Sequence, residues 1–409
     1  MKILVIVDSY PPYHSGGYEI RCRDVVENLR KFGHEIIILT TIPPKFEPYF
    51  INNIYRKLHK KNYKKTIINQ IFHDYQDIKF LDSTIQRFNP DIIYLWHLIN
   101  LSSAIIPYLS KKKYPIVYDE GGNGIQTFIK NEKNYLYFYY NKNDSIFKKE
   151  IKILFSILIQ TLSNGLIPRK WSWPNNFFIN FNNHYSLKLV EDKIGSHAKT
   201  SLIYPGIDLT KFLFEEKEEL RFPVKIIVPG RIAEVKGIKE AINLVQFLNE
   251  NGIHSILQIV GKITSEEYYS ESLRYIRHHK LEEIVEILPM ANQEILNNHY
   301  QESDICFFPS KQKIGLSRVP LEAMACGCVV ITYGNEGAIK IIRNNFSGFI
   351  VNYFNDSKEI ITLLLNNPEF YKKIMISARH EIEKKYELNK YVRSIEFFLS
   401  NVVNSSYES

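Results

Sequence analysis

The residues with the clearest chemical potential are two cations in the segment PGRIAEVKGI, Arg231 and Lys236. Arg231 directly follows a β-branched run, and Lys236 lies five residues further on, just before a helical pattern. Parallel sheets bind ligands beyond the carboxyl ends of their strands, where this loop is expected. An arginine fork and a lysine point charge suit a diphosphate. Most lysines and arginines are simply solvated, but this position favours an anion site.

One carboxylate, Glu322, stands in the otherwise small and apolar segment VPLEAMACG. Pro320 is favoured at a helix start, which predicts that Glu322 lies in the first turn. There the helix dipole stabilises a carboxylate, and capping alone would explain the residue. The functional interpretation is a bidentate acceptor for two vicinal hydroxyls, as a ribose offers.

Gly16 and Gly17 separate the first expected strand from a helix, where backbone N–H groups can approach a phosphate or a sugar hydroxyl. The pattern is not G-x-G-x-x-G, so the dinucleotide fingerprint fails. A turn that merely needs glycine is an equally good explanation.

Further polar residues, His14, His97, Asp119 and Glu120, fall at or near expected strand ends of the first half. Each, taken singly, is more typical of a structural residue than of a catalytic one. The sequence has no D-x-D and no His/Cys cluster with metal-ligand spacing, which favours a metal-independent reaction. The charge of a leaving diphosphate would then be met by the two cations and by backbone dipoles.

The elements that must position these residues alternate between short β-branched runs and helical periodicities, which predicts α/β domains with parallel sheets. A chain of 409 residues suits two domains, and both halves open on a strand, a glycine-bearing loop and a helix. Helices are expected at Glu19–Phe32, at Ile238–Asn251 and from about Glu369 to a frayed polar end. The expected strands are Ile3–Asp8, Glu35–Thr40, Asp91–Trp96, Pro115–Asp119, Phe177–Asn180, Ser201–Tyr204, Val224–Pro229, Ser255–Val260, Val285–Leu288, Ile305–Pro309, Val329–Thr332 and Phe349–Asn352.

The charge is unevenly distributed: residues 1–210 carry 28 Lys and Arg against 18 Asp and Glu, and residues 211–409 carry 24 against 26. The clusters Arg56–Lys65 and Lys111–Lys113 are explained by a solvated face or by attraction to an anionic membrane surface. No nucleic-acid motif accompanies them, so no nucleic-acid partner is expected. The longest apolar segment, Ile153–Leu162, has about half the ~20 residues that a membrane-spanning helix needs.

The four cysteines show no C-x-x-C pair and are expected to be buried thiols of a reducing compartment. The opening run ILVIVD is too short for a signal peptide and ends in an acid. These features favour a cytoplasmic protein, peripheral to the inner membrane face if the basic first half binds lipid.

Taken together, these residues resemble a GT-B glycosyltransferase of the large retaining family 4, the bacterial glycosyl transferases group 1. The resemblance covers nearly the whole chain, and the Arg…Lys pair followed by LEAMACG is its specific part. The matching stretches are SGGYEIRCRDVVENLRKFGHEIIILT, IYPGIDLTKF, VPGRIAEVKGIKEAI, QIVGK, ESDICFFPS, VPLEAMACGCVVIT and NNFSGFIV.

The resemblance implies two Rossmann-like domains facing a deep cleft: residues 1–210 bind the acceptor, residues 211–388 bind a nucleotide-diphospho-sugar, and residues 389–409 form a helix that crosses back. It implies no cofactor, and a sugar transferred with retention to a lipid-linked or cell-surface glycan. Arg231 and Lys236 would hold the diphosphate and Glu322 the ribose. Catalytic residues stay unknown, with His97, Asp119 and Glu120 as candidates. The donor-binding residues implied are Gly16, Gly17, Arg231, Lys236, Gly261, Gly315, Leu316, Ser317 and Glu322.

The sequence departs from the family pattern in three places. Ile314 stands where the first glutamate of E-x7-E is usual, Lys340 replaces an acid, and Gly121 is found where a histidine is common. These departures keep two alternatives open: a non-catalytic GT-B subunit that binds a nucleotide sugar or a partner enzyme, and a GT-B sugar epimerase.

Overall fold

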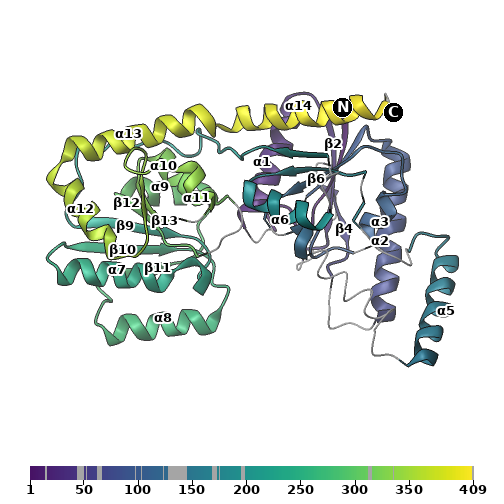
Figure 1. Cartoon of the computed structure of the whole chain (residues 1–409), viewed down its shortest axis with the longest axis horizontal. Coiled ribbons are helices and arrows are strands. Elements are labelled where there is room, and N and C mark those ends of the chain that lie inside the picture. Colours follow the sequence, from purple (N-terminus) through teal and green to yellow (C-terminus); the bar gives the residue numbers. More distant parts are fainter. Residues whose placement is uncertain are drawn as a thin grey trace. The chain divides into compact units, whose positions relative to one another are not determined.

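The chain folds into two compact units. The computed structural model describes residues 1–13, 16–43, 50–51, 53–61, 67–96, 98–102, 104–122, 124–127, 145–167, 173–174, 176–194, 199–311, 316–334 and 336–407. The N-terminal unit consists of Met1–Tyr204 with Val392–Ser409, and the C-terminal unit of Pro205–Tyr391. Each unit is built around its own sheet, and helices surround the strands of both (Figure 1).

The sheet of the N-terminal unit has the order β3-β4-β2-β1-β5-β6-β7-β8, and its paired strands are parallel except for the β3–β4 pair. The β-branched runs of the central strands are buried on both faces, as covered parallel sheets require. The strands are β1 (Lys2–Ile6), β2 (Glu35–Thr41), β3 (Phe50–Ile51), β4 (Ile54–Leu58), β5 (Ile92–Leu95), β6 (Ile116–Glu120), β7 (Phe178–Phe181) and β8 (Lys199–Leu202).

The helices of this unit supply the other half of its core. Apolar residues of α2 and α3 pack with the strands in one cluster, and those of α1 are buried as well. The helices are α1 (Gly17–Lys31), α2 (Ile67–Phe88), α3 (Ile105–Leu109), α5 (Ile146–Leu162) and α6 (His184–Ile194). The last helix, α14 (Leu388–Tyr407), contributes Glu396 and Arg393, which contact His34 and Phe32.

The sheet of the C-terminal unit has six parallel strands in the order β11-β10-β9-β12-β13-β14, with a separate core. The strands are β9 (Val224–Pro229), β10 (Ser255–Val260), β11 (Val285–Leu288), β12 (Ile305–Phe308), β13 (Val329–Tyr333) and β14 (Phe349–Val351). The helices are the 3₁₀ turn η1 (Glu234–Lys236), α7 (Ile238–Glu250), α8 (Glu266–His278), α9 (Gln293–Glu302), α10 (Arg318–Cys326), α11 (Glu336–Ile341), α12 (Asp356–Asn366) and α13 (Pro368–Lys385).

All twelve expected strands are present to within a few residues, and the expected α/β class is confirmed. The β3–β4 pair was not expected, because Arg56 and Lys57 gave its second strand a solvated appearance. Arg56 is in fact buried, and its guanidinium donates to the carbonyl oxygens of Tyr10 and Pro11 at 3.0 and 2.7 Å. The prediction that this part of the basic cluster is a solvated or lipid-binding face is therefore wrong for Arg56.

Two further expectations concern the cysteine thiols and the C-terminal end of the chain. All four cysteines are buried and free. Helix α14 extends to Tyr407, so residues 404–407 of the polar end, which was expected to be frayed, are helical. Within the described ranges, no helix has the length and apolar content to cross a membrane.

Candidate functional site

The ends of β9 and β10 meet at one edge of the C-terminal sheet. Gly230, with a φ of +141°, follows β9, and Gly261 follows the neighbouring β10. A Cβ added to Gly261 would lie 1.6 Å from the carbonyl oxygen of Gly230, closer than any side chain allows. The expected donor residue Gly261 is therefore required by packing at this edge, whatever it binds.

Lys236 lies at the end of η1, in the loop that Arg231 opens. Gly237 follows it with a φ of +72°, and a Cβ there would lie 2.5 Å from the carbonyl oxygen of Pro309, just beyond β12. The Nζ of Lys236 lies 5.9 Å from the centroid of the Phe308 ring. Burial, and then the charge of Arg231, lower the pKa of Lys236 to about 8. The two predicted cations are thus close enough to interact, with Arg231 the more exposed.

Glu322 lies in the second turn of α10, so its expected place in the first turn is wrong. The helix begins at Arg318, and its N-cap is Ser317, whose Oγ accepts from the backbone N–H of Val319 at 3.3 Å. Pro320 is the third helical residue, where its missing N–H still has no helical partner. Because the dipole effect falls off beyond the first turn, capping no longer explains Glu322.

Two donors hold the Glu322 carboxylate, one on each oxygen. The Tyr300 hydroxyl, from α9, donates to Oε2 at 3.2 Å, and the Arg318 Nε donates to Oε1 at 3.0 Å. The side chains of Arg318 and Glu322 keep only 10% and 8% of their surface exposed. An ionised carboxylate has about four lone-pair positions, so this one can still accept hydroxyl donors. Arg318 was not among the predicted site residues, although its i, i+4 spacing to Glu322 is visible in the sequence.

A buried lysine and an arginine brace the far end of α10. The Nζ of Lys217 donates to the carbonyl oxygens of Ser303 and Gly327 at 2.6 and 3.1 Å. Arg379 of α13 donates to the carbonyl oxygen of Ala325 at 2.8 Å. The last carbonyls of a helix have no helical partner, and these side chains satisfy them. The helix that carries Glu322 is thereby fixed at both ends.

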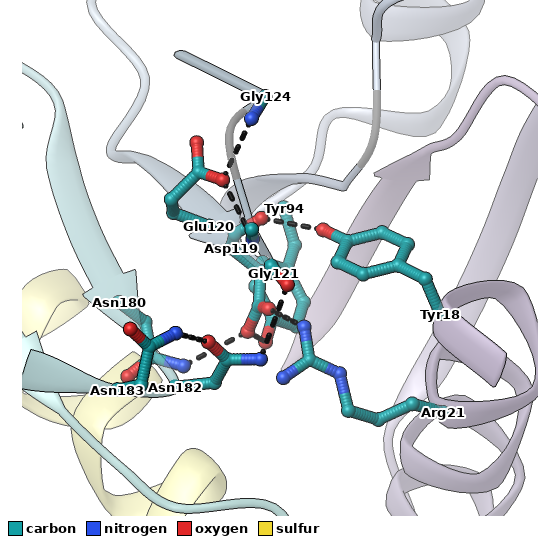
Figure 2. Close-up of polar contacts among 11 residues, drawn as sticks. Tyr18, Arg21, Tyr94, Asp119, Glu120, Gly121, Gly124, Asn180, Asn182 and Asn183 are labelled. Atoms are coloured by element: carbon teal, nitrogen blue, oxygen red, sulfur yellow. Dashed lines mark hydrogen bonds and ion pairs between the residues drawn. The ribbon is translucent and has the colours of Figure 1, made fainter. Parts of the chain in front are cut away.

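In the N-terminal unit, the candidate Asp119 is wholly buried at the centre of a polar network (Figure 2). Arg21 of α1 forms an ion pair with its Oδ1, and the Tyr94 hydroxyl and the Asn180 amide each donate to its Oδ2 at 2.8 Å. Tyr18 donates its hydroxyl hydrogen to the Asp119 carbonyl oxygen. Because every oxygen is engaged by the protein, this position favours a structural role that ties α1 to β5, β6 and β7.

The second candidate carboxylate, Glu120, is also buried and accepts three backbone N–H groups. These belong to Gly122 and Gly124 at 2.9 Å and to Ile125 at 2.6 Å; Figure 2 draws the Gly124 bond. Such a carboxylate organises the loop after β6 in the way that an N-cap residue organises a helix start. Glu120 is therefore placed as a loop-forming residue.

Between these two carboxylates and α1, Gly121 has no room for a side chain. A Cβ there would lie 1.8 Å from the Cε2 of Tyr18. The Tyr18 ring is itself held by Trp96, at 5.4 Å between centroids, and by the Arg21 guanidinium, 4.8 Å from its centroid. The ring of Tyr18 thus fills the space that a side chain at position 121 would need.

The glycine loop before α1, formed by Gly16 and Gly17, has room for a side chain at position 16, unlike Gly121. Helix α1 begins at Gly17, as expected, and Gly16 is its N-cap with an extended φ of −169° that any residue can adopt. A Cβ on Gly16 would meet the Glu19 carboxylate at 3.8 Å, an ordinary contact. The turn itself does not require glycine at position 16.

Several predicted residues are not brought into either group. His14, His97, Ile314 and Gly315 lie outside the described residues, whereas Leu316 is buried just before the α10 N-cap. Among the residues that the structure describes, no three His, Cys, Asp or Glu side chains gather to hold a metal ion. The described residues therefore form two separate groups, one in each unit. The C-terminal unit holds the cation loop, defined as Arg231–Lys236, and Glu322, and the N-terminal unit holds the Gly16–Gly17 loop and the Asp119 network.

Arg21 is the main residue of the N-terminal network that was not predicted. It lies beside Cys22 on a helix whose apolar residues Val25, Val26 and Leu29 are buried, and it is buried itself, so it needs a buried partner. The sequence alone could not say that the partner is Asp119, 98 residues further on.

Comparisons with known proteins agree with this architecture. Residues 212–381 match the family model described as glycosyl transferases group 1. An uncharacterized glycosyltransferase of Methanocaldococcus jannaschii is 22% identical over 99% of both chains. A capsular polysaccharide biosynthesis glycosyltransferase of Staphylococcus aureus, CapM, is 28% identical over 38% of this chain and 40% of its own length.

Two solved structures are similar to nearly the whole chain. Sucrose-phosphate synthase of Thermosynechococcus elongatus has a TM-score of 0.74 at 14% identity and is covered over 99% of both chains. HepE of Anabaena, solved with UDP-glucose, has a TM-score of 0.67 at 17% identity, with 98% of this chain and 100% of that one covered. At this identity the likeness concerns the fold alone, and it confirms the expected GT-B architecture.

Proposed function

We infer from the match of residues 212–381 that this chain is a member of the glycosyl transferases group 1 family, and we propose its function on that premise. It transfers a sugar, with retention and without a metal ion, from a nucleotide-diphospho-sugar to a lipid-linked or cell-surface glycan acceptor at the inner membrane face. The observation that carries the proposal is the cation loop, in which the partly buried Lys236 lies near Arg231 at the carboxyl end of β9.

The cation loop is proposed to hold the donor diphosphate. The Arg231 guanidinium can form two parallel hydrogen bonds with phosphate oxygens, and Lys236 adds a point charge in a site partly shielded from water. Such fixed charges act most strongly on the charge that develops on the leaving diphosphate. HepE was solved with UDP-glucose, which supports a nucleotide-sugar donor for this chain too.

Glu322 is proposed to accept the two ribose hydroxyls of the donor. Its carboxylate is already positioned by Tyr300 and Arg318, so its orientation does not depend on the ligand. A preoriented acceptor loses less conformational freedom when the nucleotide binds. Arg318 reduces the net charge near Glu322, which suits a neutral ribose better than a second cation.

The N-terminal unit is proposed to bind the acceptor and to present Gly16 and Gly17 to the donor phosphates. Gly16 has no conformational reason to be glycine, which supports the interpretation that backbone approach to a ligand selects it. The leaving diphosphate is proposed to take the proton from the attacking acceptor hydroxyl, because Asp119 and Glu120 are engaged inside the protein. The glycosyltransferase of Staphylococcus aureus, named for capsular polysaccharide biosynthesis, supports a glycan acceptor.

The test is incubation of the purified chain with UDP-, GDP-, ADP- and dTDP-sugars and with membrane extracts that contain glycan acceptors. Transfer from one donor is expected, and Lys236→Ala should reduce it by about 10- to 100-fold, as for a lost charged hydrogen bond. The exposed Lys373, changed to Ala, is the matched control and should leave the rate unchanged. If none of the donors gives transfer or nucleotide release, the proposal fails.

A second function, a non-catalytic GT-B subunit, is favoured by one observation. The Tyr18 ring occupies the space of any side chain at position 121, so the histidine of the family pattern has no counterpart there. Such a subunit would bind a nucleotide sugar without turning it over. Calorimetric binding of a UDP-sugar together with no product after prolonged incubation would favour this second function over the first.

A further inference from the structure

Helix α5 exposes a continuous row of apolar side chains, here called the apolar stripe. Its members are spaced by four, three, four and four residues, which places them on one helix face. Each is 50 to 72% exposed. The apolar stripe consists of Phe147, Ile151, Leu154, Leu158 and Leu162. Figure 1 draws α5 at the outer edge of the N-terminal unit, apart from its sheet.

The opposite side of α5 faces the N-terminal unit and is the more polar one. Ser156 is buried, Gln160 is half-buried, and Ile159 packs against the core cluster of the unit. A surface helix of a water-soluble domain normally turns its apolar stripe inward and its polar side to the solvent. Helix α5 has the reverse orientation, so its outward face is unusual for a surface in water.

Three lysines lie in the first half of α5 against a single acid, Glu150. By helical spacing, Lys148 borders the apolar stripe, whereas Lys149 and Lys152 lie toward the opposite side of the helix. The surrounding residues 1–210 carry 28 basic against 18 acidic side chains. A helix with large apolar residues on one face and lysines on the rest of its circumference has the composition of a segment that lies in an anionic lipid interface. Long lysine side chains can reach the head groups while the stripe enters the acyl boundary.

The size of the stripe argues against a second copy of the chain as its occupant. A helix of 17 residues is about 25 Å long and about 10 Å wide, so one face covers on the order of 250 Å². A stable protein interface needs about 800 Å² on each partner. A lipid surface has no such minimum, because the rest of the protein need not match it.

We propose that the apolar stripe of α5 docks the protein on an anionic phospholipid bilayer, with the helix lying in the plane of the interface. At 17 residues, α5 is shorter than the ~20 that span a bilayer, so it lies on the membrane and does not cross it. This inference extends the proposed function, since it would bring the N-terminal unit to a lipid-linked acceptor. It is tested without glycosyl transfer, so either one can fail alone.

The experiment is flotation of the full chain with vesicles of phosphatidylglycerol and phosphatidylcholine, or of phosphatidylcholine alone. Wild-type protein should float with the anionic vesicles and be released by salt. The double variant Leu154→Glu/Leu158→Glu should lower the bound fraction by more than about tenfold, because two exposed apolar groups become charged. Phe397→Glu on α14, where Phe397 is 70% exposed, is the matched control and should float like wild type.

Each remaining outcome decides against the proposal. If wild type does not float with anionic vesicles, the protein does not dock on an anionic bilayer. If the double variant floats as well as wild type, the docking surface is not α5. If wild type sediments as a dimer that the double variant dissociates, the stripe is an interface between copies. Circular dichroism and UDP binding of the double variant should match wild type, which separates lost docking from misfolding.

Discussion

Lys236 changes its charge close to working pH. Its pKa of about 8, lowered first by burial and then by Arg231, means that the free protein loses this positive charge above pH 8. UDP serves as a probe of the proposed diphosphate site. We expect its affinity to be constant from pH 7 to about pH 8 and then to fall by up to about tenfold per pH unit.

The replacement Lys236→Arg should flatten this profile, because arginine keeps its proton over the whole range. Lys373→Arg, at an exposed position, should leave the profile as it is in wild type. Isothermal calorimetry in buffers from about pH 7 to 9.5 measures both. A wild-type affinity that does not change with pH would mean that Lys236 does not contact the diphosphate.

Gly121 should tolerate no side chain as long as Tyr18 is present. Gly121→Ala forces its Cβ against the Tyr18 ring and should cost about 1–3 kcal/mol of unfolding free energy, the usual range for overpacking. In a Tyr18→Ala background the same replacement should cost much less, which a double-mutant cycle in urea detects.

Gly16→Ala is the matched control for this cycle. A Cβ there meets only an ordinary contact, so stability should change by less than about 0.5 kcal/mol. Its effect should appear in donor binding instead, because the added methyl group would separate the backbone from the phosphates. An equal cost of Gly121→Ala in both backgrounds would contradict the packing explanation.

At the scale of the elements, α10 depends on a lysine outside it. Lys217→Met would remove the buried ammonium group that donates to the carbonyl oxygens of Ser303 and Gly327. We expect a loss of about 1–3 kcal/mol, the cost of unsatisfied buried polar groups, with weaker UDP binding through Glu322. Denaturant unfolding measures the first and calorimetry the second; Lys373→Met is the control, and equal stability of the two variants would refute the bracing role.

The sequence predicted the strands well, but it predicted poorly the buried ion pairs and hydrogen bonds that connect them. Runs such as ILVIV and IIVP are short, continuous, β-branched stretches that are typical of buried parallel strands, so their places were readable. The start of α10 was misplaced because Pro320 suggested a helix start, whereas Ser317, three residues earlier, provides the cap.

Arg21 and Arg56 show why these buried ion pairs and hydrogen bonds were not predicted. Each is a charged residue whose partners lie far along the chain: Asp119 for Arg21, and Tyr10 and Pro11 for Arg56. Local pattern assigns such residues to the solvent, and only the folded sheet brings their partners near. The same limit applies to one donor of Glu322: Tyr300 lies 22 residues before it, whereas the i, i+4 spacing of Arg318 was readable.

At the scale of the whole molecule, the two units have separate cores and should unfold separately. Differential scanning calorimetry should therefore resolve two transitions. UDP should raise the transition of the C-terminal unit, because a ligand that binds only the folded state stabilises it; at 100 times its Kd the gain is about 2.7 kcal/mol. A single transition that shifts as one would show that the units are thermodynamically coupled.

The placement of Trp96 beside Tyr18 and Arg21 gives this chain a selective optical reporter. Its three tryptophans, Trp96, Trp171 and Trp173, all belong to the N-terminal unit, and the C-terminal unit has none. Tryptophan emission therefore follows the N-terminal unit alone. Trp96, buried with a guanidinium 5.1 Å from its ring, should change its emission when α1 moves on β6. The glycine loop before α1 can thus be followed in solution without a label.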